Sequence, residues 1–591
     1  MKQALKHLKI GKQHYEGAAD HYARFILDCQ LKDHALWQKF VNVFSTREDA
    51  ADDGWRGEYF GKMMRGACIT YAYLPDEELY AVLEETVRAL LAAQDEKGRI
   101  STYPTTHEFC GWDLWCRKYV LVGCLYFHDI CKDEALREDI LSAMKKHADY
   151  ILDRIGAGKI SILDTSVWWG GLNSSSILEP IIELYKKTAE PRYLAFAEYL
   201  IQEGGCKDGN LLDVVKEGRL LPHEYPTTKA YEMMSYFEGV LAYYEVTGKE
   251  EYLRLAETFA KAVRENEITV IGCAGCKSEQ FNHSVEKETE AVRDKTIMQE
   301  TCVTVTWMRL QERLLLNTGD VGYAEAMENS ALNALYGAVN LHKNKQFCKE
   351  EKSLLPGVPF DSYSPLVAQP RGIGIGGYKK FAEGGYYGCC ACIGAAGTGL
   401  YPLSSVLEAE DGYLFLFYET GKIELDGASA EALYDPMQGK YTLSIHTDGA
   451  SCPTLSFRIP AWANAPTIGI SGKDIPLDPT ARIYTAKDLH NGDVLSFDFA
   501  PSLSALERNG KTAFFYGPYV LARDEGKEKG RITSKISLSE LSYQKEAPEE
   551  GETIRLRLHS KKGAVLLTDY ASCGKHWDRS RRRISVWHTV R

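Results

Sequence analysis

The sequence lacks the long apolar runs that membrane-spanning and secreted proteins contain. No stretch approaches the length needed to cross a bilayer. The first residues, Met1–His7, lead into charged and polar residues and contain no apolar segment of the kind found in signal peptides. Sixteen cysteines without such a signal are typical of reduced thiols rather than of a disulfide framework. We therefore expect a cytoplasmic protein with no membrane partner.

Basic residues are not arranged in the stripe that a nucleic-acid surface needs. The net charge is −12, and the only dense basic cluster lies at residues 579–583. Phosphates would require a basic face or stripe, so we expect no nucleic-acid partner. Hydrophobic residues at 45% and charged residues at 26% are ordinary globular values, and 591 residues are enough for several domains.

The first two thirds of the chain have a helical pattern. Apolar residues recur at helical spacing in 76–94 and 138–155. A repeat places Tyr193 after Thr188, Tyr252 after Thr247 and, more weakly, Tyr323 after Thr318. We expect one helix to end near each Thr and the next to begin near each Tyr. Repeated helical hairpins form an open solenoid or a closed α/α barrel, and the aromatic connection at 168–172 favours the barrel.

The remainder of the chain has a β pattern. Residues 413–418, 441–445 and 455–459 alternate or are rich in β-forming residues, and 494–499 and 512–521 continue the pattern. We predict a helical-barrel catalytic domain followed by β-sandwich material. The predicted domains are the barrel at 1–406, a β-sandwich at 407–525, and a C-terminal β segment at 526–591 that completes or flanks the sandwich.

Two short segments, Gln299–Cys302 and Gly388–Cys392, carry the most specific chemical signal. They offer one carboxylate and up to four thiols, a set that suits a tetrahedral zinc ion. If the segments meet in space, they form a thiolate-rich metal site, either catalytic or purely structural. Cys273 and Cys276 also have zinc-knuckle spacing, but no second pair follows at a regular distance, so a core or loop role is favoured.

On these segments the chain resembles glycoside hydrolase family 127, the β-L-arabinofuranosidase family. The resemblance rests on Glu300–Cys302 and the double cysteine at 389–390, with support from 458–462 and 517–521. It implies an (α/α)6 barrel followed by β-sandwich domains, in agreement with the pattern of the residues. It also implies a retaining exo-glycoside hydrolase that contains Zn²⁺ and acts on a short oligosaccharide or glycoside.

The resemblance also implies residue roles. The zinc ligands would be Glu300, Cys302, Cys389 and Cys390. Cys389 would be the nucleophile, and Glu279 in the segment 278–281 would be the general acid/base. The interval from Glu279 to Glu300 is longer than usual in the family, so the rivals for this role are Glu286, Glu288 and Glu290.

Departures from the family pattern leave the sugar open. Family members commonly continue the double cysteine with Pro-x-Asn, whereas this chain has Ala391–Gly394, so Cys392 is an alternative metal ligand or nucleophile. Lys118 and Lys229 stand nearest to the positions of the family's sugar-binding histidines. With Trp112, they are the expected substrate contacts, or else surface and packing residues.

The expected chemistry needs a thiolate and a carboxyl group. A free thiol has a pKa of about 8.5, and a bound cation keeps it in the thiolate form that attacks carbon. A carboxyl group then protonates the departing oxygen and later deprotonates water.

Two other classes of function remain open. A lyase or unsaturated-glycoside hydrolase on a helical barrel would survive loss of the cysteines. A non-catalytic, zinc-stabilised sugar-binding protein would tolerate Glu279→Gln and Cys389→Ser. The linkage and oligomeric state are not determined by the sequence, a homodimer being one option.

Overall fold

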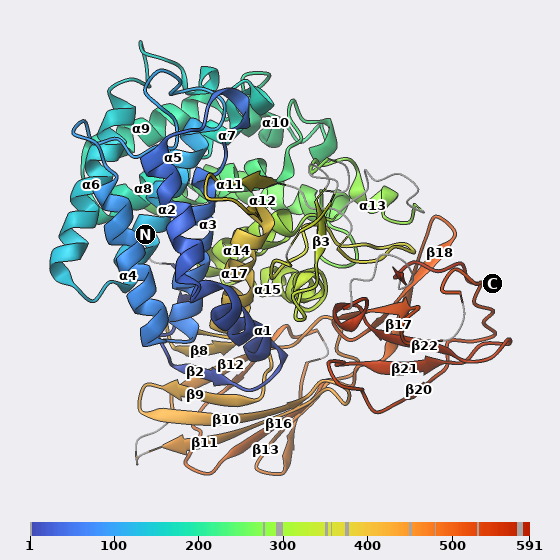
Figure 1. Cartoon of the computed structure of the whole chain (residues 1–591). Coiled ribbons are helices and arrows are strands. Elements are labelled where there is room, and N and C mark those ends of the chain that lie inside the picture. Colours follow the sequence, from blue (N-terminus) through green and yellow to red (C-terminus); the bar gives the residue numbers. More distant parts are fainter. Residues whose placement is uncertain are drawn as a thin grey trace.

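A helical N-terminal part and a β-rich C-terminal part make up the computed structural model of the chain (Figure 1). The structure describes residues 3–275, 278–290, 299–348, 353–355, 357–372, 377–447, 449, 452–478, 480–528, 531–575 and 583–591. This order confirms the predicted fold class. Within the described residues, no helix has both the length and the apolar composition needed to cross a membrane.

The helical part is built around a closed inner ring of helices. The ring consists of α3 (Gly57–Tyr73), α5 (Asp113–Ile130), α8 (Leu178–Thr188), α11 (Ala230–Thr247), α14 (Thr301–Thr318) and α17 (Cys389–Leu403). Each helix packs on the next in this order, and α17 packs on α3 to close the ring. These helices are buried on nearly all sides, as expected for helices enclosed by others.

An outer layer of helices covers the ring. It consists of α1 (Ala18–Ile26), α2 (His34–Thr46), α4 (Glu77–Ala92), α6 (Glu134–Leu152), α9 (Pro191–Glu203), α12 (Glu250–Asn266) and α15 (Gly322–Asn329). They are amphipathic: α12, for example, buries Ala256, Phe259, Ala260 and Val263 and exposes charged residues on its other face. Short helices lie in the connections, namely α7 (Leu172–Ser175), α10 (Leu211–Glu217), α13 (Ser284–Lys287) and α16 (Tyr336–Ala338). The inner ring and outer layer form the predicted α/α barrel.

The threonine repeat marks the turns from inner to outer helices. Helices α8, α11 and α14 end at Thr188, Thr247 and Thr318. Each threonine hydroxyl donates to the carbonyl four residues earlier at 2.8 Å, and the following residue adopts a left-handed conformation that stops the helix. The outer helices α9, α12 and α15 begin three or four residues after each threonine, as predicted.

Two sheets form the β-sandwich below the barrel (Figure 1). The first has the order β1 (Lys6–His7), β7 (Val406–Ala409), β8 (Gly412–Phe415), β12 (Thr454–Arg458) and β15 (Ile483–Ala486). The second has the order β14 (Lys473–Ile475), β13 (Thr467–Ile470), β16 (Val494–Asp498), β11 (Lys440–Thr447), β10 (Ala428–Asp435), β9 (Gly421–Leu425) and β2 (Gln13–Tyr15). Strands β1 and β2 thus tie the N-terminal segment to sheets formed about 400 residues later.

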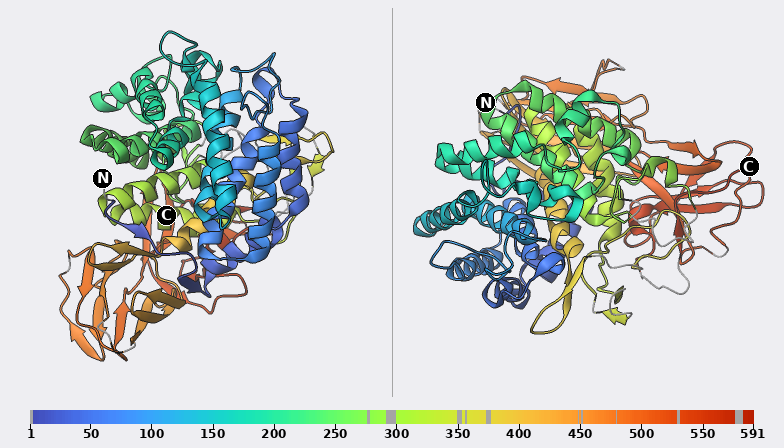
Figure 2. Two further views of the ribbon diagram at one scale, coloured as in Figure 1. Left: turned by 90° about the vertical axis from the view of Figure 1, so that its left-hand side faces the viewer. Right: turned by 90° about the horizontal axis from the view of Figure 1, so that it is seen from above.

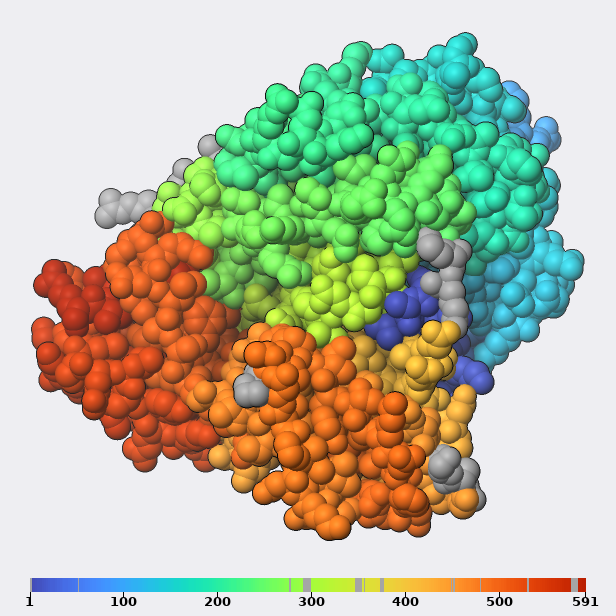
Figure 3. Space-filling view, turned by 180° about the vertical axis from the view of Figure 1, so that it is seen from behind, coloured from blue at the N-terminus to red at the C-terminus, as the bar shows by residue number. Residues whose placement is uncertain are grey.

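A third sheet lies beside the sandwich. Its order is β17 (Leu503–Arg508), β18 (Lys511–Tyr516), β19 (Tyr519–Asp524), β22 (Val565–Asp569), β21 (Arg555–Leu558) and β20 (Tyr543–Lys545), with β23 (Ile584–Ser585) paired to β19. Two hairpins, β3 (Gln346–Cys348) with β4 (Ser353–Leu355) and β5 (Tyr378–Lys380) with β6 (Tyr386–Gly388), project from the helical part. Figures 2 and 3 show both β regions against the helices. The domain limits at 406 and 525 stay predictions.

A buried ion pair joins the barrel to the sandwich. The guanidinium of Arg458, at the end of β12, binds the carboxylate of Glu328 on α15, with Nη1 at 3.3 Å from Oε2. Arg458 is fully buried, and its Nε donates to the carbonyl of Leu416 at 2.7 Å. The indole of Trp462 donates to the same Glu328 carboxylate at 3.0 Å. One carboxylate therefore compensates a charge enclosed between two parts of the protein.

Glu328→Gln should lower the free energy of unfolding by about 3–5 kcal/mol, because it leaves the Arg458 charge buried without its counterion. The midpoint of urea unfolding, followed by circular dichroism, measures the effect. The matched control is Glu84→Gln, which removes the exposed pair with Arg88 and should cost at most about 1 kcal/mol. Equal shifts in the two variants would contradict the role of the buried pair.

Candidate active site

Three cysteine sulfur atoms lie together where the first turns of α14 and α17 meet. The Sγ atoms of Cys302, Cys389 and Cys390 all lie within 4.8 Å of one another, and those of Cys302 and Cys390 are 3.3 Å apart. Cys302 is the second residue of α14, while Cys389 and Cys390 begin α17. Both helices direct their positive dipole ends at the sulfurs, which favours thiolates. The two segments singled out in the sequence thus form one group, which could hold a metal ion.

Glu300 adds a carboxylate beside this sulfur group. It occupies the N-cap position of α14 without a capping bond from its side chain, and its Oε1 lies 4.0 Å from the Cys390 sulfur. Its Oε2 is buried without a hydrogen-bond partner among the described residues. Burial, and next the Glu279 carboxyl, raises the pKa of Glu300 well above its usual range. A buried oxygen without a donor beside three thiols fits a cation site, and sulfur with carboxylate is a donor set that zinc accepts.

The backbone of Gly377 fixes the position of the Cys389 sulfur. Gly377 has a φ of +66°, and a Cβ built on it would lie 2.2 Å from Cys389 Sγ. Its carbonyl accepts hydrogen bonds from the Tyr59 hydroxyl and from the Trp55 indole, both close to the start of α3. The Cys389 amide also donates to it at 3.3 Å. Only glycine fits here, since any side chain would displace the thiol.

Glu279 lies close to Glu300. A Cβ built on Gly275 would lie 3.5 Å from Glu300 Cβ and 3.6 Å from Glu279 Cα. The Glu279 carboxylate binds the Lys229 ammonium and accepts a hydrogen bond from the Tyr363 hydroxyl at 2.8 Å. Glu279 has a φ of +64°, an uncommon conformation for a residue with a side chain and one found at functional sites. The structure therefore brings Lys229 and Glu279 together beside the predicted metal ligands.

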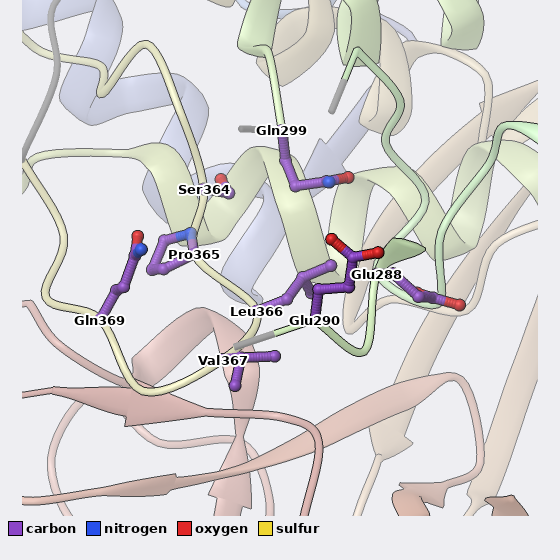
Figure 4. Close-up of a pocket in the computed structure, with 8 residues that line it drawn as sticks. All are labelled: Glu288, Glu290, Gln299, Ser364, Pro365, Leu366, Val367 and Gln369. Carbon is purple, nitrogen blue, oxygen red and sulfur yellow. The ribbon is translucent and has the colours of Figure 1, made fainter. Parts of the chain in front are cut away.

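The three rival glutamates lie toward the third sheet. Glu288 is buried, binds Arg508 of β17 and accepts a hydrogen bond from the Val270 amide at 2.9 Å. Glu286 lies on α13. Glu288 and the exposed Glu290 line a small pocket; Figure 4 shows it with its other lining residues, Gln299, Ser364, Pro365, Leu366, Val367 and Gln369. Proximity to Glu300, whose pKa the Glu279 carboxyl raises, distinguishes Glu279 from these residues.

A buried ion pair of α3 also acts on the cysteines. Lys62 Nζ lies 3.1 Å from Glu58 Oε1 and 4.3 Å from the ring centre of Tyr231. The pKa of Cys389 lies well below its usual range despite burial. Hydrogen bonds from Cys302 and Cys390 lower it most, and the charges of Lys62 and Lys229 lower it further. Burial raises the pKa of Glu58 to about 7.

Glu58, Lys62 and Tyr363 were not predicted from the sequence. A glutamate and a lysine four positions apart in an otherwise mostly apolar helix could have indicated the first two.

The other predicted residues are not part of the sulfur group. Cys392 is fully buried on α17 and lies outside the sulfur group found among the described residues. Trp112 is half-buried and packs edge-on against Trp55 and Trp115. Lys118 is fully buried, and its ammonium donates to the hydroxyls of Ser176 and Ser235. Sugar contact by Trp112 and Lys118 stays a prediction.

The second residue of the predicted zinc-knuckle pair, Cys276, lies outside the described residues. Its partner Cys273 is buried, with its sulfur 3.2 Å from the Glu300 carbonyl oxygen.

Gly377→Ala should reduce metal binding at least about tenfold, because the new methyl group would occupy the position of the Cys389 sulfur. Titration with zinc, with bound metal measured by elemental analysis, tests this. The matched control is Gly384→Ala: this glycine also has a positive φ, but a Cβ built on it would meet no atom within 4 Å, so the change adds backbone strain alone. Equal metal binding in the two variants would show that Gly377 does not position the thiol.

Lys118 should make stability depend on pH. Burial lowers the pKa of Lys118 to about 7, whereas in the unfolded chain it is about 10.4. Between these values the unfolded chain binds a proton that the folded protein does not, so this group makes the free energy of unfolding rise with pH. The melting temperature of the wild type should therefore rise relative to that of Lys118→Met from about pH 7 to about pH 10. A constant difference would show that this lysine stays charged in the folded protein.

The family relationship follows from comparison with known proteins. A family model described as β-L-arabinofuranosidase, GH127 catalytic domain, matches residues 19–349, more than half of the chain. Comparison with curated proteins gives no match.

Solved structures resemble the chain over its whole length. A GH127 β-arabinofuranosidase, 15% identical, superposes with a TM-score of 0.78 and covers 100% of this chain and 98% of its own. A GH127 β-L-arabinofuranosidase from Geobacillus stearothermophilus T6, 16% identical, has a TM-score of 0.71 and covers 99% and 100%. At such identities the likeness shows the fold, and it extends beyond residue 349 into the β part. With the match of the catalytic-domain model, the chain belongs to glycoside hydrolase family 127, as its Glu-Thr-Cys segment and double cysteine had indicated.

Proposed function

We propose that the protein is a retaining exo-glycosidase that uses Cys389 as its nucleophile and Glu279 as its general acid/base. The observation that carries the proposal is the group of three sulfurs at two helix N-termini, with the Glu300 carboxyl group beside it and Glu279 close to Glu300. The substrate would be a short oligosaccharide or glycoside, with a terminal β-L-arabinofuranosyl group as the first choice from the family description. The cytoplasmic location stays a prediction.

Zinc is the metal that best fits the donor set. Cys302, Cys389, Cys390 and Glu300 supply three sulfurs and one oxygen, and zinc binds such ligands in tetrahedral geometry. When bound, the ion would keep its ligands deprotonated and fix their direction. Cys392 would not take part, since it lies outside the sulfur group.

Exposure favours Cys389 as the nucleophile. Its exposed fraction is 8%, against 1% for Cys302 and Cys390 and 0% for Cys392. The lowered pKa of Cys389 supports the same choice, because the thiolate is the attacking form. In the first step the Cys389 sulfur would bond to the anomeric carbon while the bond from that carbon to the leaving oxygen breaks.

Glu279 would act on both the leaving oxygen and the attacking water. Its side chain is 25% exposed, and Tyr363 and Lys229 hold the two carboxylate oxygens. In the first step its carboxyl proton would pass to the leaving oxygen. In the second step its carboxylate would take a proton from the water that attacks the anomeric carbon, and the Cys389 thiolate would leave. Two displacements retain the configuration of the sugar.

The test combines metal content and activity in matched variants. Wild type should contain about one zinc per chain and hydrolyse one glycoside from a panel of aryl furanosides and pyranosides. Cys389→Ser should lose activity at least about a thousandfold, as expected when a nucleophile is removed. Cys392→Ser, a change of the same kind on the same helix, should keep both zinc and activity. A metal-free active wild type, or an active Cys389→Ser, would refute the mechanism.

Glu279→Gln should lose about a hundredfold or more on an alkyl glycoside, the range that general acid–base catalysis contributes. On an activated aryl glycoside, the variant's first step should slow less, because the aryl leaving group departs without a proton. The control is Glu290→Gln, an exposed rival nearby. If Glu290→Gln shows the loss and Glu279→Gln does not, the assignment of the acid/base is wrong.

A further inference from the structure

An exposed tryptophan lies in the connection between α6 and α7. The 3₁₀ segment η4 (Trp168–Gly171) directly precedes α7. Trp168 is 37% exposed and Val167 before it 74%, so the connection presents apolar side chains to solvent. Val167 and Trp168 are adjacent, and exposed apolar groups that lie together can mark a ligand-binding surface.

The backbone of this connection is held in a strained conformation. Trp169 has a φ of +52° and a ψ of +34°, which are rare for a bulky residue, and Gly170 and Gly171 also have positive φ. The Lys207 amide donates to the Gly170 carbonyl at 2.8 Å, and a Cβ on Gly170 would lie 2.6 Å from the Cys206 sulfur. These contacts hold the backbone of the connection at Gly170, and strain of this kind is found at functional sites.

The two indoles lead outward from Glu279. The Lys229 ammonium that binds Glu279 lies 5.5 Å from the ring centre of Trp169. The ring centres of Trp169 and Trp168 are 5.8 Å apart, and their planes are inclined by 36°. The buried indole N–H of Trp169 has no hydrogen-bond partner among the described residues. No such bond therefore explains why the ring lies where it does. The series Glu279, Lys229, Trp169, Trp168 therefore runs from the predicted acid/base to solvent.

The chemistry places the leaving group on this side. In a retaining glycosidase the nucleophile and the acid/base flank the scissile bond, and the acid/base protonates the departing oxygen. The part of the substrate beyond that oxygen thus lies on the side of Glu279. Sugar rings present C–H groups on their faces, and these pack on the electron-rich faces of indoles.

We propose that Trp168 and Trp169 form the subsite for the leaving group and bind a second sugar unit of the substrate. The assignment of this subsite to the leaving group rests on the proposed function, in which Glu279 is the general acid/base. It specifies the substrate class: glycosides whose leaving group is itself a sugar, rather than a small alcohol.

The test measures binding and hydrolysis with two probes that share the terminal sugar: methyl β-L-arabinofuranoside and a disaccharide that ends in β-L-arabinofuranose. Binding is measured by calorimetry on wild type and on Trp168→Ala, and hydrolysis as kcat/KM. The disaccharide should bind more tightly than the methyl glycoside to wild type. Trp168→Ala should remove this difference and lower kcat/KM for the disaccharide about tenfold, with little change for the methyl glycoside.

Two further variants separate stacking from folding. Trp168→Phe should recover most of the preference for the disaccharide, because it restores an aromatic face. Leu433→Ala, at a 66% exposed position on β10, should change nothing.

Equal losses on both probes, or no loss on either, would overturn the subsite. Failure to hydrolyse either probe would count against the proposed mechanism. The sugar subsite would still stand if wild type binds the disaccharide more tightly than the methyl glycoside and Trp168→Ala does not. Equal affinities in wild type and Trp168→Ala would overturn the subsite whatever the activity.

Discussion

The site depends on the meeting of two helix N-termini. The three sulfurs come together because α14 and α17 are neighbours in the inner ring and begin at the same end of the barrel. Several thiolates so close would repel one another, so the arrangement needs compensating positive charge. The helix dipoles and the ammonium groups of Lys62 and Lys229 supply part of it, and a bound cation would supply more.

Buried charge continues along the inner ring, away from the cysteines. Arg309 of α14 lies 3.1 Å from both Glu179 of α8 and Glu238 of α11. Lys118 of α5, whose pKa burial lowers to about 7, bonds instead to the neutral hydroxyls of Ser176 and Ser235. A buried ion such as Arg309 is tolerated only when its charge is compensated, and each of these contacts joins different parts of the barrel. The barrel interior is therefore held by specific polar contacts as well as by apolar packing, which suits a scaffold that must keep a site rigid.

Local patterns predicted much of this fold. Helix ends followed from the threonine repeat, and the β part from alternation after residue 406. The sulfur group was predictable because four thiols and a carboxylate in two short segments are rare. The contacts of Tyr363 with Glu279 and of Trp169 with Lys229 could not be predicted, because no sequence period encodes them. The pairing of β1 and β2 with strands beyond residue 405 was missed for the same reason.

That pairing constrains the order in which the protein can fold during synthesis. Strand β1 pairs with β7 and β2 with β9, so the β2 segment has no partner until residues beyond 420 have emerged from the ribosome. The helix α17 that closes the ring also comes late. Contacts between residues so far apart in sequence form slowly. The nascent chain must therefore keep an open ring with two unpaired edge segments for most of its synthesis, and such edges are open to wrong pairings until the last strands arrive.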